Sequence, residues 1–297
     1  MDNGISYCMK VLLLGTHPSN VWVRSFIEGA AESEPSLYLE FLEIEAQLQR
    51  EQLLPLMSNS VDALILSDYL PAYFHETLNG LSLVSLVRSE AQRAVLALEL
   101  VEQANRTLTL DRSHFDLWPM KISEFFGLPL HCFPSLPPPA ASNALQPGLT
   151  STPLISQYLE PLFAAARGAD LLRLIWPSDS FLDGDAPDQI LPQTVEVAGR
   201  ARILAYGPYL PLPRGKWLAR AYLGFSTDIG KMPFILEVDT GETVSRGFFE
   251  VDRGGIFSVE LEFQIVELLP LVELRLISQD SALEGQIALI EIELQCL

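Results

Sequence analysis

The chain has 297 residues, 48% of them hydrophobic, with 38 acidic and 19 basic side chains and a formal charge of −19. This length and apolar content allow two domains with sizeable cores. An acidic surface gains little from docking on a polyanion, so nucleic acid and anionic membranes are unfavourable partners.

The cysteines and the first residues predict a location. Three cysteines (Cys8, Cys132 and Cys296) lie far apart, which fits neither a disulfide framework nor a Cys-x-x-Cys metal site and suits a reducing compartment. The start "MDNGISYCMKVLLLG" lacks the basic residues and cleavage site of a signal peptide. No apolar run approaches the ~18 residues of a membrane span. We therefore expect a cytoplasmic protein with no membrane span and no bound metal.

The first half of the chain alternates strand-like and helical patterns. Apolar runs predict strands at 9–16, 37–44, 61–67 and 107–111. Helical spacing predicts helices after the N-cap Ser19 and over 46–57, 88–106 and 154–174, the last kinked at Pro161. This order predicts an α/β domain over 1–175, built on a doubly wound parallel sheet.

Two segments of this half are rich in turn residues. Six prolines over 133–153 predict a surface strap or a lid over the strand ends. The acidic stretch 176–193 is expected to be a linker.

After this linker the helical pattern ends. Seven short alternating runs predict strands at 201–207, 215–225, 233–239, 243–251, 256–266, 271–278 and 284–294. Strands at this spacing are typical of an antiparallel β-sandwich, here jelly-roll-like, which we expect over 194–297. Gly207, Pro208 and Pro211 are expected in the connection between the first two strands, because proline cannot donate to a central ladder.

Candidate catalytic residues follow the predicted strands of the first domain. His17 and Ser19 come after the first strand, where the carboxyl ends of parallel strands and a helix N-terminus can bind an anion, although His17 could simply cap the turn. Asp111 and His114 follow a later strand in Asp-x-x-His spacing, which lets a carboxylate orient an imidazole. That element resembles the last block of the SGNH hydrolases, whose Gly-Asp-Ser block is missing here.

Candidate binding residues lie in both halves. Asp68 and His75 follow the third strand, where they could contact substrate or be ordinary loop residues. In the second half Tyr209 and Trp217 could stack on a sugar ring, together with Tyr206, Tyr222 and Phe225. The alternative is that Trp217 and Phe225 belong to the core.

Each half of the chain resembles a known protein family. The strand "KVLLLG", the turn Gly15-Thr16-His17-Pro18 and the later "ALILSDYL" resemble the capsular-polysaccharide-biosynthesis acetyltransferases (WcbI-like) over Lys10 to Leu136. That family carries Gly-Asn-Cys-Gln at the turn, so His17 replaces its cysteine, and the resemblance implies coenzyme A as acyl donor. The segments "ILAYGPYLPLPRGKWLARAYLGF" and "EGQIALIEIEL" are similar to an accessory β-sandwich of bacterial polysaccharide-biosynthesis proteins.

The patterns and the resemblances support two main hypotheses. The first is acyl transfer to, or acyl removal from, a sugar in surface-polysaccharide assembly, with a saccharide and an acyl-CoA as partners. His17 or His114 would act as base, Asp111 would orient it, and Ser19 would be nucleophile or oxyanion contact. The second is a non-catalytic module that binds carbohydrate or a glycosyltransferase of the pathway. A glycosyltransferase fragment is a third hypothesis, which is less favoured because the α/β half is short for two nucleotide-sugar domains.

Overall fold

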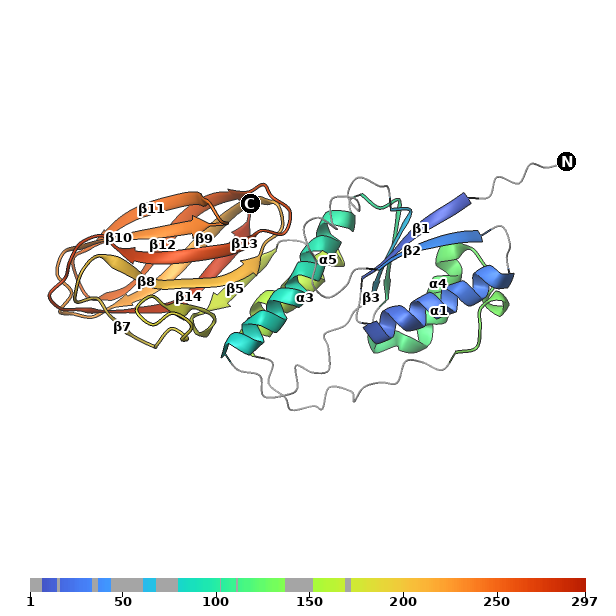
Figure 1. The fold of residues 1–297 in the computed structure, drawn as a ribbon, viewed down its shortest axis with the longest axis horizontal. Helices are drawn as coiled ribbons and strands as arrows, with labels where there is room; N and C mark the ends of the chain where they lie inside the picture. The colour runs from blue at the N-terminus through green and yellow to red at the C-terminus, as the bar shows by residue number, and fades with distance from the viewer. Residues whose placement is uncertain are drawn as a thin grey trace. The chain divides into compact units, whose positions relative to one another are not determined.

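The computed structural model describes residues 7–14, 17–33, 37–43, 61–67, 80–101, 103–110, 112–136, 152–168 and 172–297 (Figure 1). The chain divides into two compact units. The first comprises Met1–Thr77 and Ala97–Leu149, and the second comprises Leu78–Leu96 and Thr150–Leu297. The helix expected over 46–57 lies outside the described residues.

The first unit is built on a four-stranded parallel sheet in the order β2-β1-β3-β4. Its strands are β1 (Tyr7–Leu14), β2 (Leu37–Glu43), β3 (Ala63–Ser67) and β4 (Arg106–Leu110). Its helical elements are α1 (His17–Ser33), η2 (Arg112–Leu117), α4 (Trp118–Phe126) and η3 (Leu130–Cys132). The prediction of a parallel α/β sheet is confirmed. The strand order reverses between β1 and β3, as in doubly wound sheets.

One face of this sheet is covered by α1 and α4 through an aromatic core. Apolar residues recur at helical spacing along α1, which turns Trp22, Phe26 and Ala30 towards the strands. The ring of Phe26 stacks on Trp22 at 4.9 Å and on Phe133 at 4.7 Å. Phe115 stacks on Trp118 at 4.2 Å, which ties η2 to α4. This packing holds α1 and the turn after β4 on the same face of the sheet.

The second unit is an antiparallel β-sandwich of two five-stranded sheets and also contains helical segments (Figure 1). One sheet has the order β11-β10-β13-β8-β6, and the other has the order β12-β9-β14-β5 with β7 pairing to β14. The strands are β5 (Arg173–Pro177), β6 (Leu182–Asp183), β7 (Val195–Glu196), β8 (Arg202–Pro211), β9 (Gly215–Phe225), β10 (Met232–Asp239), β11 (Thr243–Val251), β12 (Gly255–Ile265), β13 (Leu271–Ser278) and β14 (Gln286–Cys296). The predicted β-sandwich is therefore present.

Helices of the second unit differ in extent from the prediction. Helix α3 (Gly80–Val101) begins before the expected start at Arg88 and ends before β4, and its first part belongs to this unit. The helix expected over 154–174 is divided into η4 (Ile155–Leu159) and α5 (Glu160–Ala166), followed by η5 (Ser178–Ser180) after β5. The wide π-type turn of η4 directly precedes Pro161, which has no N–H to donate to an earlier carbonyl.

Strand β8 continues through the prolines that the sequence placed in a connection. Pro208 pairs with Glu273 and Pro211 pairs with Leu271 of β13, so both lie within the ladder, which corrects that expectation. The missing N–H is tolerated because β6 pairs with β8 only at Tyr206 and Ala205. Beyond Tyr206 the other side of β8 is a sheet edge, where proline is allowed.

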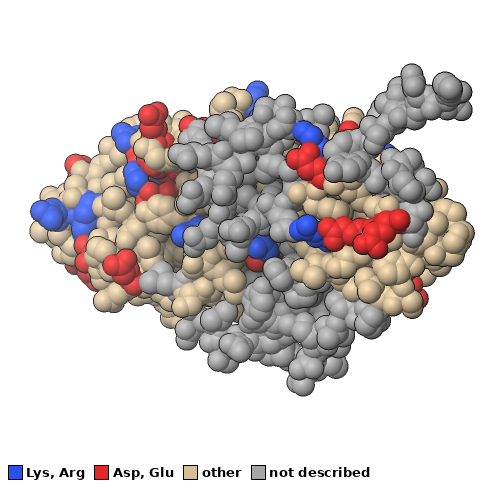
Figure 2. All heavy atoms as spheres, turned by 45° about the vertical axis from the view of Figure 1, so that its right-hand side comes forward, with Lys and Arg blue, Asp and Glu red and all other residues tan. Residues whose placement is uncertain are grey.

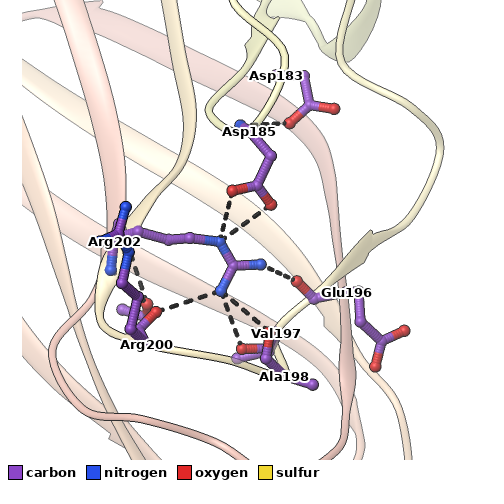
Figure 3. A network of polar contacts seen from close by, with 8 residues as sticks. Asp183, Asp185, Glu196, Val197, Ala198, Arg200 and Arg202 are labelled. Carbon is purple, nitrogen blue, oxygen red and sulfur yellow. Dashed lines mark hydrogen bonds and ion pairs between the residues drawn. The ribbon is translucent and has the colours of Figure 1, made fainter.

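The predicted boundaries at 175 and 194 fall inside the sandwich. Strand β5 pairs with β14 and β6 pairs with β8, so the stretch 176–193 contributes to both sheets. Arg202 joins this stretch, at Asp185, to the backbone of residues 196–200 through several hydrogen bonds (Figure 3). Its Nε donates to Asp185 Oδ1 at 2.8 Å and Oδ2 at 3.0 Å. Its two Nη atoms donate to the carbonyls of Glu196, Val197, Ala198 and Arg200. The turn-rich composition of 176–193 did not predict these strands, because their pairing partners in β14 and β8 lie far away along the chain.

We expect Arg202→Lys to lower the free energy of unfolding by about 2 kcal/mol, because an ammonium cannot reproduce the planar fork and leaves backbone carbonyls unpaired. Arg253→Lys, an exposed arginine whose guanidinium lies 5.9 Å from the Phe257 ring centre, is the control and should change stability by less than about 0.5 kcal/mol. Urea unfolding followed by circular dichroism measures both. Equal stability of the two variants would contradict the role given to Arg202.

Candidate functional site

The carboxyl edge of the parallel sheet carries two of the predicted catalytic positions. Helix α1 begins at His17 directly after β1, and His114 is an exposed residue of η2 directly after β4. All four strands are parallel, so both segments lie at the same edge, and β3 separates β1 from β4. Neighbouring strands are ~4.8 Å apart, which puts the two strand ends roughly 10 Å from each other.

Most other predicted positions of this unit cannot be compared with the structure. Asp68, His75 and Asp111 lie outside the described residues, and so do the side chains of His17 and Ser19. The hypothesis of a catalytic cluster at this edge therefore stays a prediction.

Trp217 lies in the sandwich core and not on a binding surface. It is fully buried on the inner face of β9, and its Nε1 donates to the Pro213 carbonyl at 3.0 Å. Residues two apart on a strand share a face, so Ala219 and Ala221 are buried beside it. A buried indole is closed to a sugar ring, which corrects the prediction for Trp217. The alternative interpretation, that Trp217 is a core residue, agrees with its burial.

The outer face of the sheet β11-β10-β13-β8-β6 carries a polar cluster that the sequence analysis did not predict. Phe234, Leu236 and Val238 of β10 point into the core, so Glu237 and Asp239 point outwards. The strand register sets Arg275 of β13 beside Glu237, and Glu273 beside Asp239. We call Glu237, Asp239 and Glu273 with Arg246 and Arg275 the ionic cluster. Its signal in the sequence is a pair of charges two residues apart in "LEVD" and in "VELR", within otherwise apolar strands.

Arg275 bridges all three carboxylates of the ionic cluster. Its Nη1 donates to Glu237 Oε1 at 3.1 Å and to Asp239 Oδ2 at 3.2 Å, and its Nη2 donates to Glu273 Oε2 at 2.5 Å. The hydrogen bond to Glu273 is the main cause that raises the pKa of Arg275. Arg246 pairs with the other oxygen of Glu237, through Nε at 2.7 Å and through Nη2.

The carboxylates of the ionic cluster are withdrawn from water although they belong to an outer face. Glu237, Asp239 and Glu273 are only 3%, 7% and 5% exposed. Burial of an ionised carboxylate is unfavourable unless the charge is paired and hydrogen-bonded. Three carboxylates face two guanidinium groups, so the cluster keeps a net negative charge.

Two tyrosines extend the ionic cluster across the sheet. Tyr206 of β8 is the register partner of Arg275, and its ring meets that of Tyr209 edge to face at 6.3 Å. The Tyr209 hydroxyl is hydrogen-bonded to Glu273, and its pKa is raised, first by burial and then by this bond. Both rings are half-buried, so each keeps part of its surface open.

Helix α3 fixes the backbone of Tyr209. The residue has φ 60°, a left-handed conformation that costs about 1–3 kcal/mol for a side chain other than glycine. Arg88 Nε donates to the Tyr209 carbonyl at 2.7 Å and Arg88 Nη2 to the Pro208 carbonyl at 3.2 Å. Burial lowers the pKa of Arg88. The Tyr209 ring is thus held at a set place beside the ionic cluster.

An apolar row runs beside the polar one on the same outer face. The register aligns Phe248, Ile235 and Ile277 across β11, β10 and β13, and Ile203 of β8 continues the line. The Phe248 side chain is 65% exposed. The outer face therefore offers charged, aromatic and aliphatic groups in adjacent rows, which we call the ligand face.

The surface of the described residues is mixed in charge. On the face shown in Figure 2, basic and acidic side chains are interspersed and form no continuous basic area among the described residues. None of the helices within the described ranges has both the length and the apolar run needed to span a bilayer. No group of three or more histidine, cysteine or acidic side chains suited to a metal ion occurs in the described part of the chain.

Comparison with known proteins returns structural likenesses only. No protein-family model matches the chain, and no curated protein matches it. The resemblance to the WcbI-like acetyltransferases therefore stays a prediction.

Several solved structures resemble part of the chain. The C-terminal CBM6 of LamC, a marine laminarinase from Zobellia galactanivorans, matches at 17% identity and a TM-score of 0.28, over 41% of this chain and 98% of that one. The K1 cleaved adhesin domain of Lys-gingipain from Porphyromonas gingivalis matches at 12% identity and a TM-score of 0.31, over 42% and 98%. An arabinose-bound α-L-arabinofuranosidase matches at 10% identity and a TM-score of 0.27, over 43% of this chain but 23% of its own length. Likenesses at these identities and TM-scores define no function for this chain.

We expect Arg275→Met to lower the free energy of unfolding by about 2–4 kcal/mol at neutral pH, because three nearly buried carboxylates lose their shared cation. Adding Glu237→Gln should restore part of this loss, since it removes one of the repelling charges. Lys231→Met is the control. The ion pair of Lys231 with Glu250 is exposed, so Lys231→Met should lower the free energy of unfolding by less than about 1 kcal/mol. Urea unfolding at matched ionic strength measures the three variants, and an Arg275→Met protein as stable as the control would contradict the assignment.

Proposed function

We propose that the β-sandwich binds a saccharide on the ligand face. The observation that carries this proposal is the row of preset hydrogen-bonding groups beside Tyr206 and Tyr209. Sugar hydroxyls both donate and accept, so they can accept from the part-exposed guanidinium groups of Arg246 and Arg275 and bond to the hydroxyl of Tyr206. Aromatic side chains supply apolar contact area at low conformational cost.

Pre-organisation favours such a role over a merely structural one. The cluster residues lie on neighbouring strands, and each carboxylate is already held by Arg275 or Arg246. A ligand that bonds to fixed groups loses less entropy than one that must order them. The half-exposed tyrosines leave apolar surface available next to these groups.

The charge of the ligand face selects among saccharides. The ionic cluster keeps one uncompensated carboxylate, and the whole chain carries −19. A uronic acid would be repelled by this field, whereas neutral sugars and amino sugars would not. We therefore propose neutral or cationic saccharides as ligands. This function corresponds to the carbohydrate-binding module hypothesis, in which the α/β unit has no catalytic duty.

Acyl transfer to a sugar, or acyl removal from one, is the second candidate. The observation in its favour is that α1, which begins at His17, and η2, which contains His114, start at the same carboxyl edge of the sheet. Ligands of open α/β sheets bind at that edge. His114 would act as base with Asp111 as its orienting partner, and Ser19 or His17 would complete the site. An acyl-CoA would be the donor in the cytoplasm, as the WcbI-like resemblance implies.

Binding to the ligand face is tested with Tyr206→Ala. A panel of neutral, amino-substituted and uronic oligosaccharides is titrated by calorimetry against the native chain and the variant. We expect a neutral or amino sugar to bind, and Tyr206→Ala to weaken it about tenfold through the lost ring contact. Ile256→Ala removes an exposed apolar side chain from β12 of the other sheet and is the control. Absence of binding throughout the panel, or an equal loss in the control, would overturn the proposal.

The second candidate is tested with His114→Ala. Acyl-CoA and acetylated sugars are supplied, and release of coenzyme A or acetate is followed. Loss of a general base should lower kcat by about 10²–10⁴. His131→Ala, an exposed histidine of η3, is the control and should retain full activity. If the native chain shows no turnover, or the two variants turn over equally, this candidate is wrong.

A further inference from the structure

A second ligand position is indicated by a serine hydroxyl without a partner. Ser67 is the last residue of β3 and is 6% exposed, and its Oγ makes no hydrogen bond. A buried hydroxyl without a partner is costly by roughly 1–3 kcal/mol, and native structures rarely keep one without a reason. The hydroxyl therefore has unused capacity to donate to a ligand.

The strand register gives the direction of this hydroxyl. Ser67 pairs with Leu110 of β4, and Ile65 precedes it by two positions on β3. Leu110 and Ile65 both belong to the core beneath α1 and α4. Residues two apart on a strand share a face, and so do register partners. The side chain of Ser67 therefore lies on the face that α1 covers, at the carboxyl end of the strand.

The N-terminus of α1 lies at the same corner of the sheet. β1 is the parallel neighbour of β3, with Leu14 opposite Leu66, and α1 starts at His17. The first N–H groups of a helix have no intrahelical acceptor and carry partial positive charge. α1 has 17 residues and no acidic side chain in its first turn, so no carboxylate of its own takes these donors.

We propose that this corner binds the phosphate group of a ligand, with Ser67 Oγ and the backbone N–H groups of His17 and Ser19 as donors, since Pro18 has no N–H. The corner is also the point where the strand order reverses between β1 and β3, which is where open α/β sheets bind ligands. A phosphate has several strong acceptor oxygens, so it can receive the helix donors and the hydroxyl together. This inference is independent of saccharide binding by the sandwich, because it rests only on residues of the first unit.

Ser67→Ala tests the proposal with two opposite readouts. Without ligand, the variant should be as stable as the native chain or more stable, because a hydroxyl without a partner is removed. With inorganic phosphate or a phosphate monoester, the variant should bind at least about tenfold more weakly by calorimetry, since a hydrogen bond to a charged group is lost. Sodium chloride at equal ionic strength controls for general salt effects, and the monoester shows whether free or esterified phosphate is preferred.

Ser123→Ala is the matched control in the same unit. Its Oγ donates to the Leu128 carbonyl at 2.6 Å, so this variant should lose stability and keep phosphate binding. Three results would overturn the proposal. These are no phosphate binding to the native chain, equal binding to the native chain and Ser67→Ala, and a loss of stability in ligand-free Ser67→Ala.

Discussion

One arginine, Arg275, stabilises the charged outer face of the sheet β11-β10-β13-β8-β6. Three carboxylates stand there within reach of one another and are nearly closed to water. Arg275 donates to each of them, and Arg246 adds a second positive charge at Glu237. Without this pairing, mutual repulsion and lost hydration would drive the carboxylates apart. The ordered acceptors, the bond from Tyr209 to Glu273 and the proposed saccharide site all depend on it.

The α/β unit depends on a different constraint, which is the common direction of its strands. Parallel strands end at one edge, so the segments that follow β1, β3 and β4 meet there although they are far apart in the chain. Strand direction places His17, Ser67 and His114 at that edge, because each lies at or just after the end of a parallel strand. The two proposed ligand positions thus differ in kind: one is an ionic cluster on a sheet surface, and the other is a hydroxyl at a strand end.

The local patterns were sufficient for the architecture but not for the site. Continuous apolar runs and alternation of apolar with polar residues predict most strands. Burial of one or both faces of a strand determines which of its neighbouring residues are apolar. Strands β5 and β6 were missed, since Trp176 and Leu182 find their partners in β14 and β8, which no local window contains. Trp217 was assigned to a binding surface because composition alone cannot tell which face of a strand is the inner one.

The sequence by itself determined the acidic character, the succession of an α/β half and an all-β half, and the period of each element. These follow from residue type and from spacing within a few positions. Only the tertiary structure decided which charges meet, because Glu237 and Arg275 become neighbours through strand register. It likewise decided that the Ser67 hydroxyl, at the end of β3, is buried and has no hydrogen-bond partner. Register and layer packing bring distant residues together, and no spacing along the chain records that.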